Sequence, residues 1–346
     1  MPAGASRIRT FFSGTARHPD QRRCPMIPER RSNNTCCNRK PVPHVIDGLG
    51  RSTVTSPFVR RRRLAAELRT LREERGMTAD RLACLIHQSR MKISKLENAH
   101  VRPDLADVMK ILDVLGVTGE KWHEIVRIAR DAAERGWWDA YGDAMGDRQR
   151  LYADIESGAK TIREYQPGAM PGILQTPDYI WALIEHAKAE GPITYIPERL
   201  VEARLQRQRT VLRPGGPEYE VILDEVGLRR FSVPPDVMYA QLHHVIKIAE
   251  THARVTVRVF PVITGMATSL MPRSQLILFA FPDASDPPLA VTETVSTDIF
   301  HTDPKEVSRH LRRYEYVLGT ALSEVSSLTY LSELADQIVN DVELDT

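Results

Sequence analysis

The stretch TADRLACLIHQSRMKISKLEN, residues 78–98, decides how the N-terminal domain of the chain folds. Its apolar residues recur three or four positions apart, which is the spacing of a helix with one buried face. Thr78 and Ser89 are favourable N-cap residues, and a tight connection at His87 and Gln88 separates the two apolar runs. The stretch therefore predicts two short helices joined by a turn. The side chains expected to brace them are Leu82, Ala83, Ile86, Ile93 and Leu96.

Further helices are predicted on both sides of this pair. A leucine pattern after Phe58 predicts a preceding helix, which Gly76 ends as a C′ glycine. Beyond a proline break, apolar residues at helical spacing predict a fourth helix, and residues 120–135 predict a fifth. Residues 58–136 are therefore expected to form an all-α domain of five helices that contains a helix-turn-helix.

The net charge of +2 hides a strong asymmetry along the chain. Residues 1–103 carry 22 Lys and Arg against 8 Asp and Glu, whereas residues 104–346 carry 25 against 37. A basic segment joined to an acidic body is typical of a nucleic-acid-binding module attached to a module that does not bind nucleic acid. A solvated basic tail gives the same count, so charge alone does not decide between the two.

The second helix of the pair carries the chemistry for reading DNA. A reading helix must be braced by its neighbour and must present polar or basic side chains to the major groove. Arg90, Met91 and Lys95 face away from the expected core. Since an arginine or lysine pairs well with guanine O6 and N7, these side chains are the predicted base contacts.

Phosphate contacts are expected around the same helix. The backbone N–H groups that follow Ser89 favour an anion, and Lys92 and Arg102 add cations for the DNA backbone. The alternative for this domain is a small helical bundle that binds protein, because such bundles show the same apolar spacing. A protein-binding adaptor is therefore a second possible function of this domain.

The segments LRTLREERGMTADRLA (68–83) and SRMKISKLEN (89–98) resemble the xenobiotic-response-element or Cro-repressor class of helix-turn-helix proteins. The resemblance implies an ion pair between Arg72 and Glu97 that orients the reading helix. It also implies base contacts at Arg90, Met91 and Lys95. The phosphate contacts that it implies lie near Thr78, Ser89, Lys92 and Asn98.

Two residues depart from that class. His87 stands where its turn usually has glycine, and Ala99 stands where glycine usually follows the reading helix. Side chains other than glycine tolerate left-handed backbone poorly. We therefore expect strained or differently built turns at these two positions.

Residues 137–335 are predicted to form a mixed α+β domain, followed by a tail over residues 336–346. The predicted helices lie at 147–166, 177–189, 197–212, 235–251 and 304–322. The predicted strands lie at 219–223, 255–260, 275–281 and 289–294. The whole chain is therefore expected to be an α+β multidomain protein.

The segments WWDAY (137–141), IESGAKTIREYQP (155–167), PGILQTPDY (171–179) and LDEVGLRR (223–230) are similar to actinobacterial antitoxin-like regulators. This resemblance implies a DNA-binding regulator that is paired with a small partner protein encoded nearby. It is the resemblance, and not the composition, that carries this implication.

A proline-bounded loop within that similarity offers a candidate pocket or partner surface. Its aromatic and aliphatic side chains are Tyr165, Pro171, Leu174 and Tyr179. The alternative, which we favour, is a structural turn that links two core helices. The sequence does not separate the two.

Residues 1–57 are rich in Arg, Pro, Ser and Asn and are predicted to form a disordered basic leader, although an over-extended gene start is an alternative account. The leader holds Cys24, Cys36, Cys37 and His44, whose spacing matches no compact zinc motif. We therefore predict no metal and no cofactor. The few cysteines and the absence of a long apolar run favour a cytoplasmic, nucleoid-associated protein without a membrane segment.

These patterns together predict a sequence-specific transcriptional regulator that binds double-stranded DNA as a homodimer. We find no catalytic motif, so the chain is not expected to be an enzyme. The remaining alternative is an enzyme domain fused to the DNA-binding module, which requires a polar pocket with clustered titratable groups between residues 140 and 335.

Overall fold

The computed structural model describes residues 55–263, 270–294 and 297–344, with side chains described as far as residue 340. The predicted leader lies outside this part except for its last three residues, and so do the possible zinc ligands. Within the described part, Cys84 is a free and exposed thiol. No helix there is both long enough and apolar enough to cross a membrane.

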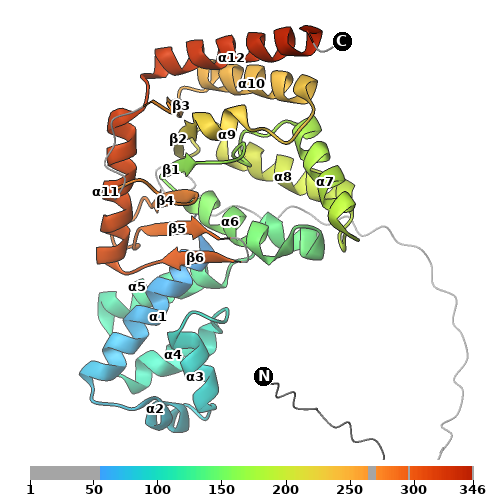
Figure 1. Ribbon diagram of the computed structural model, residues 1–346. Coiled ribbons are helices and arrows are strands. Elements are labelled where there is room, and N and C mark those ends of the chain that lie inside the picture. Colours follow the sequence, from blue (N-terminus) through green and yellow to red (C-terminus); the bar gives the residue numbers. More distant parts are fainter. Residues whose placement is uncertain (1–54, 264–269, 295–296, 345–346) are drawn as a thin grey trace, which may run out of the picture. The chain divides into compact units, whose positions relative to one another are not determined.

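Five α-helices form the N-terminal domain, as the apolar spacing predicts (Figure 1). They are α1 (Pro57–Glu74), α2 (Ala79–Leu85), α3 (Arg90–Glu97), α4 (Leu105–Val114) and α5 (Gly119–Ala133). The hydroxyl groups of Ser56, Thr78 and Ser89 accept backbone N–H bonds at the starts of α1, α2 and α3, so local capping fixes where these helices begin. The helices bury a common core that includes Leu64, Leu68, Ile93 and Leu112.

A mixed sheet forms the centre of the C-terminal domain. Its strands are β1 (Thr161–Gln166), β2 (Glu218–Asp224), β3 (Val255–Phe260), β4 (Leu276–Ala280), β5 (Leu289–Glu293) and β6 (Asp298–His301). They lie in the order β3-β2-β1-β4-β5-β6. The β1, β2 and β3 strands are parallel, whereas β4, β5 and β6 run antiparallel to their neighbours. The prediction of an α+β fold is confirmed.

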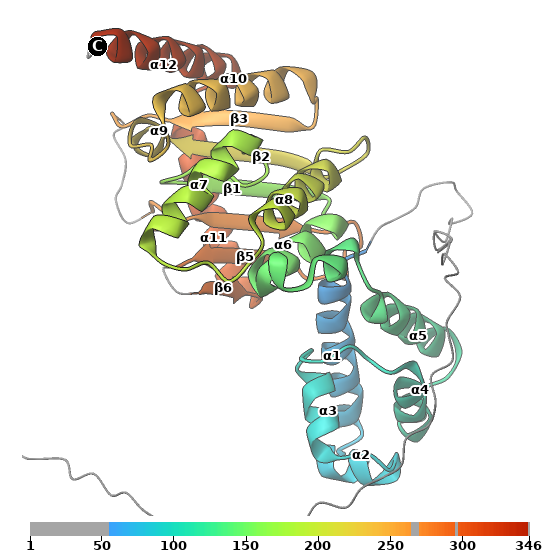
Figure 2. The same ribbon diagram turned by 90° about the vertical axis from the view of Figure 1, so that its right-hand side faces the viewer.

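Helices cover both faces of this sheet (Figure 2). One face packs against α6 (Gly146–Gly158), α7 (Pro177–Glu190), α8 (Pro197–Val211), α10 (Pro235–Thr251) and α12 (Glu324–Leu344). The other face packs against α11 (Pro304–Thr320). A 3₁₀ segment, η1 (Trp137–Ala144), leads into α6, and the short α9 (Glu225–Arg229) follows β2. The sheet is therefore a middle layer, and its buried strands explain the apolar runs in the sequence.

The first helix belongs to both domains. Val59 packs in the large core of the sheet domain, whereas Leu64 and Leu68 pack in the core of the helix-turn-helix domain. The side chain of Asp154 on α6 accepts from the hydroxyl of Ser56 at 2.7 Å and from the backbone N–H of Phe58 at 3.0 Å. The start of α1 is therefore held by residues of the sheet domain.

The elements of the C-terminal domain differ from the prediction at several places. The helix predicted over 147–166 ends at Gly158, and 161–166 form the central strand β1. The charged Glu164 breaks a strand-like apolar pattern there, but the fold buries it among hydrogen-bond donors. The predicted tail is the second half of α12, where Ile338 packs in the sheet core. The short edge strand β6 was not predicted.

Candidate DNA-binding surface

The candidate reading helix α3 is held by its apolar side. Ile93 and Leu96 are 1% and 7% exposed and pack with α1, α2 and α4 in one core. The Ser89 hydroxyl accepts the backbone N–H of Lys92 at 3.2 Å, which caps the helix at its start. The helix therefore has a buried underside and a free outer side, as a reading helix requires.

The predicted base contacts lie on the free side of α3. Met91 is 65% exposed, the side chain of Arg90 is 72% exposed, and Lys95 is exposed as well. Arg90 pairs with the equally exposed Asp80 of α2, with Nε and Oδ2 3.3 Å apart. A pair of this kind is solvent-screened and weak, so it leaves Arg90 available for a DNA base.

The ion pair implied by the family resemblance is present. The Nε and Nη2 atoms of Arg72 donate to the two carboxylate oxygens of Glu97 at 2.7 and 2.9 Å, and both side chains are largely buried. The hydrogen bonds to Glu97 raise the pKa of Arg72 above its ordinary value. This two-bond contact fixes the end of α3 against α1.

A second arginine of α1 supports the same helix end, and the sequence reading missed it. Arg69 donates from Nη2 to the backbone carbonyl of Glu97 at 2.6 Å and to the side-chain oxygen of Asn98 at 2.8 Å. The arginines at 69 and 72 are three residues apart and therefore lie on one face of α1. That spacing was the available signal.

The residues predicted to contact phosphates differ in the hydrogen bonds and ion pairs that they already make within the protein. Thr78, Ser89 and Asn98 are exposed, but each already makes a local hydrogen bond. Lys92 pairs with Asp107, and Arg102 donates to Asp139 of η1 at 2.7 Å. DNA has to compete with these two carboxylates, which lowers the gain expected from each lysine or arginine.

Each of the two turns around α3 places one non-glycine residue in the left-handed region of the backbone. These are the two positions where the related class usually has glycine. His87 has a φ of 55° and Ala99 has a φ of 58°. The Ala99 N–H still reaches the carbonyl of Leu96 at 3.1 Å, and the His100 N–H reaches that of Lys95 at 2.9 Å. The turn after α3 therefore keeps its backbone hydrogen bonds. Strain remains because residues with a Cβ occupy a backbone conformation that favours glycine.

The densest basic run of the chain lies away from α3. Arg60 and Arg63 of α1 are only 7% and 6% exposed at their side chains. Their guanidinium groups approach Asp283 at 3.1 and 2.7 Å, and both also pair with Asp286 of the same β4–β5 turn. Arg63 pairs further with Glu124 of α5 at 2.6 Å. Arg60 and Arg63 therefore join the two domains, and both are already paired with carboxylates.

The four candidate pocket or partner residues are all buried. Tyr165 and Leu174 are fully buried, Tyr179 is 3% exposed, and Pro171 is buried as well. The Tyr165 hydroxyl donates to the carboxylate of Asp224 at 2.7 Å. The structure therefore corrects the idea of an open partner surface at these residues, because their side chains fill the sheet domain's core.

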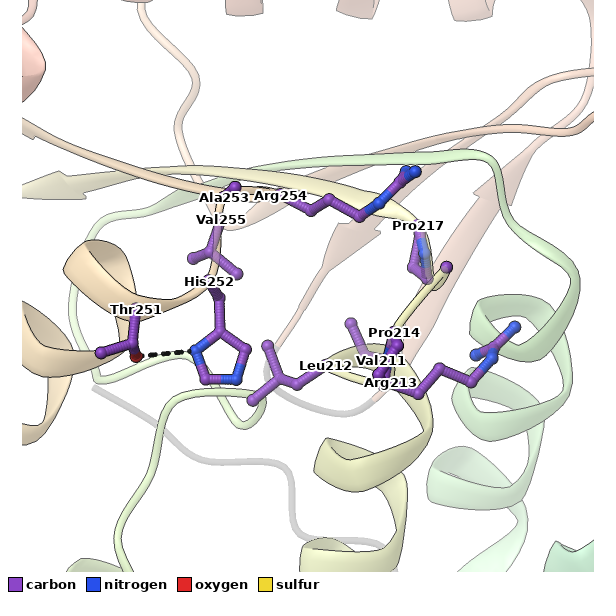
Figure 3. Close-up of a pocket in the computed structure, with 11 residues that line it drawn as sticks. Val211, Leu212, Arg213, Pro214, Pro217, Thr251, His252, Ala253, Arg254 and Val255 are labelled. Atoms are coloured by element: carbon purple, nitrogen blue, oxygen red, sulfur yellow. Dashed lines mark hydrogen bonds between the residues drawn. The ribbon is translucent and has the colours of Figure 1, made fainter.

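A cavity of about 370 Å³ lies where α8 leads into β2 and α10 leads into β3 (Figure 3). The guanidinium groups of Arg213 and Arg254 extend away from the imidazole of His252 in this view. Both arginines donate to backbone carbonyls, for example Arg254 to Gly216 at 3.2 Å. Both guanidinium groups are therefore held by the backbone, and neither one is left without a hydrogen-bond acceptor.

Comparison with known families gives two matches, one in the helical domain and one in the sheet domain. A helix-turn-helix domain matches residues 63–124, and a domain of unknown function, DUF5753, matches residues 149–333. The second match covers more than half of the chain. The chain belongs to the DUF5753 family. No curated protein and no solved structure matches it.

The DUF5753 match begins in α6 and ends in α12, so it includes the whole described sheet. The helix-turn-helix match runs from α1 into α5 and includes every residue of the candidate reading helix. This DUF5753 protein is therefore a DNA-binding regulator of the helix-turn-helix type.

Proposed function

We propose that the protein is a sequence-specific transcriptional regulator of the Cro type, without catalytic activity, that binds DNA as a dimer and associates with the nucleoid. The observation that carries the proposal is the geometry of α3. Arg90, Met91 and Lys95 are exposed on a short helix whose underside is buried and whose end the Arg72–Glu97 pair holds. Such a helix suits the major groove, where base edges can be read.

The test is selection of DNA sites from a random pool, followed by titration of the selected duplex at several salt concentrations. A selected motif with two half-sites about one helical turn apart supports a dimer. The affinity is expected to fall steeply with salt, and Lys92→Ala is expected to reduce the logarithmic salt slope by about 1. Enrichment of no motif, together with a weak salt dependence, would contradict the proposal.

We also propose an antitoxin-like pairing with a small partner protein. Its support is the similarity of residues 137–179 to antitoxin-like regulators, together with exposed apolar side chains on the sheet domain. Ile299 of the edge strand β6 is 47% exposed, and Val325 of α12 is 77% exposed. Co-expression with the product of a small adjacent reading frame tests this pairing. Elution of the two proteins apart in size-exclusion chromatography would contradict it.

The adaptor alternative uses the helical domain for protein contact. Arg90, Lys92 and Lys95 favour DNA instead, because three cations on one short helix suit phosphates and base edges better than an apolar partner groove. A protein complex that survives in full when these three residues are changed to alanine, with no DNA binding in the wild type, would favour the adaptor.

A further inference from the structure

A second cavity, of about 200 Å³, lies at the carboxyl end of β1 in the DUF5753 domain. Its walls come from α6, α7, α8, β1, β4, β5 and the loop between β1 and α7, and most of the lining side chains are polar. Glu164 and Gln166 reach it from β1, because alternate residues of a strand point to the same face of the sheet. Arg204 and Arg207 reach it from α8.

Two of the arginines around this cavity are already paired. Arg207 holds both oxygens of Glu156, with Nε and Oε2 2.6 Å apart. Arg148 of α6 pairs with Glu293 at 2.5 Å and with Asp298 at 2.7 Å. These guanidinium groups have their counter-ions within the protein, so neither one needs an external anion.

Arg204 has no such counter-ion in the part of the chain that the structure describes. Its Nη1 atom donates to the amide oxygen of Gln175 at 2.9 Å, and its buried Nε–H has no hydrogen-bond partner there. Burial and the neighbouring Arg207 and Arg148 lower the pKa of Arg204 to about 10. Arg204 is half-buried and is held only by a neutral amide, which is a costly setting for a guanidinium, and an incoming anion would offset that cost.

A neighbouring polar group points to the same kind of ligand. Gln166 lines the cavity and is 8% exposed, yet its side-chain amide makes no hydrogen bond to the described residues. We propose that this cavity binds a small molecule through a carboxylate that pairs with Arg204 and is oriented by Gln166. The cavity is smaller than the roughly 300–1,000 Å³ of sites for drug-sized ligands, which restricts the occupant to a small metabolite.

Glu164 indicates which second functional group the small molecule carries besides its carboxylate. Its carboxylate accepts from the Tyr219 hydroxyl at 2.8 Å and from Nε2 of Gln275 at 2.6 Å. Burial raises the pKa of Glu164 to about 7, although both hydrogen bonds oppose this rise. A carboxylate oxygen has a second lone pair, so Glu164 can also accept from an ammonium group. An α-amino acid therefore fits better than a dicarboxylate, and both serve as probes.

The cavity is connected to the DNA-binding domain through α6. One side of this helix presents Arg148 and Tyr152 to the cavity, and Asp154 on the same helix holds the start of α1 and the guanidinium of Arg61. A ligand that shifts α6 therefore acts on the helix that carries Arg69 and Arg72. This effector role rests on the proposed function, whereas binding of the ligand does not.

The test is titration of the full chain with L-glutamine and with succinate, by isothermal calorimetry at constant ionic strength. We expect saturable binding, tighter for L-glutamine, and at least roughly tenfold weaker binding in Arg204→Gln. The matched control is Arg209→Gln, which removes an exposed arginine from the same helix and is expected to bind as the wild type does. Gln166→Leu serves as a second variant, with an unchanged thermal midpoint as the check on folding.

Three outcomes would overturn the proposal: neither probe binds the wild type, Arg204→Gln binds both probes as tightly as the wild type does, or Arg209→Gln loses as much affinity. Tighter binding of succinate than of L-glutamine would overturn only the role given to Glu164. Arg90→Ala separates this site from the proposed function, since it is expected to lose DNA and to keep the probe. Conversion of a bound probe, followed by NMR, would show an enzyme rather than a sensor.

Discussion

Two basic clusters in the N-terminal domain differ in exposure, since one is buried and the other faces the solvent. On α1, Arg60, Arg61 and Arg63 pair with carboxylates, and the side chains of Arg60 and Arg63 are less than a tenth exposed. The cations of α3 face outward, and the side chain of Arg90 is 72% exposed. The sequence shows similar positive charge in both places. What separates them is whether folding brings acids from distant parts of the chain, as the β4–β5 turn does for α1.

The largest expected effect comes from breaking the buried cluster. Arg63→Met removes a buried cation that Glu124, Asp283 and Asp286 share, so the free energy of unfolding should fall by about 3 kcal/mol. Urea denaturation measures this loss. The control is Arg90→Met, which makes the same chemical change on the exposed cluster and should alter stability by no more than about 0.5 kcal/mol. Similar losses in both variants would contradict the comparison.

The exposed cluster is expected to show the reverse pattern. Arg90→Ala or Lys95→Ala should weaken binding to the selected duplex by about 1–3 kcal/mol, a loss of roughly 5- to 150-fold, with an unchanged thermal midpoint. Fluorescence anisotropy measures the affinity. Arg127→Ala, which removes an exposed arginine from α5, is the matched control and should bind as the wild type does. Equal losses in all three variants would indicate a general charge effect and not base reading.

Acid should weaken the buried cluster as Asp283 takes up a proton. Burial tends to raise the pKa of Asp283, but the backbone N–H of Ser285 and the guanidinium of Arg63 outweigh it and bring the pKa to about 2. The pKa in the unfolded chain is higher, near 3.8, so this carboxylate stabilises the fold above about pH 4 and ceases to do so as pH falls towards 2. Asp283→Asn should therefore flatten the decline of stability in that window. An unchanged decline, measured by urea midpoints, would exclude Asp283 as its source.

The smallest expected effect lies at the turn that follows α3. Ala99 has a φ of 58°, where a Cβ is strained, so Ala99→Gly should raise the free energy of unfolding by about 1 kcal/mol. Gly76 has nearly the same φ, and no atom lies within 4 Å of a Cβ built there. Gly76→Ala is thus a matched reverse change and should lower stability by a similar amount. A loss of stability in Ala99→Gly would show that the alanine side chain makes a contact worth more than the strain.

The helix-turn-helix domain was largely predictable because its signals are local. Capping hydroxyls at Thr78 and Ser89 and apolar residues three or four apart fix α2 and α3 without help from the rest of the chain. The exposure of Arg90 and the burial of Ile93 follow from the same helical period. The base and phosphate contacts assigned to this surface remain predictions.

The sheet domain was less predictable because its decisive contacts are distant in sequence. Glu164 is buried only because Tyr219 and Gln275, 55 and 111 residues away, supply hydrogen bonds to it. No periodicity in 161–166 reveals those partners, so β1 was mistaken for helix. The unpaired state of Arg204 is equally invisible in the sequence, since it depends on which acids the neighbouring arginines have taken.

The sharing of α1 between two cores has a consequence for how the molecule melts. Because α1 is one continuous helix, loss of the packing of Val59 also disturbs the packing of Leu64 and Leu68. A scanning calorimeter should therefore record one endotherm for both domains and not two, and a fragment cut after α5 should melt well below the intact chain. Removing the DUF5753 domain to study DNA binding alone would remove the contacts that hold the start of the first helix.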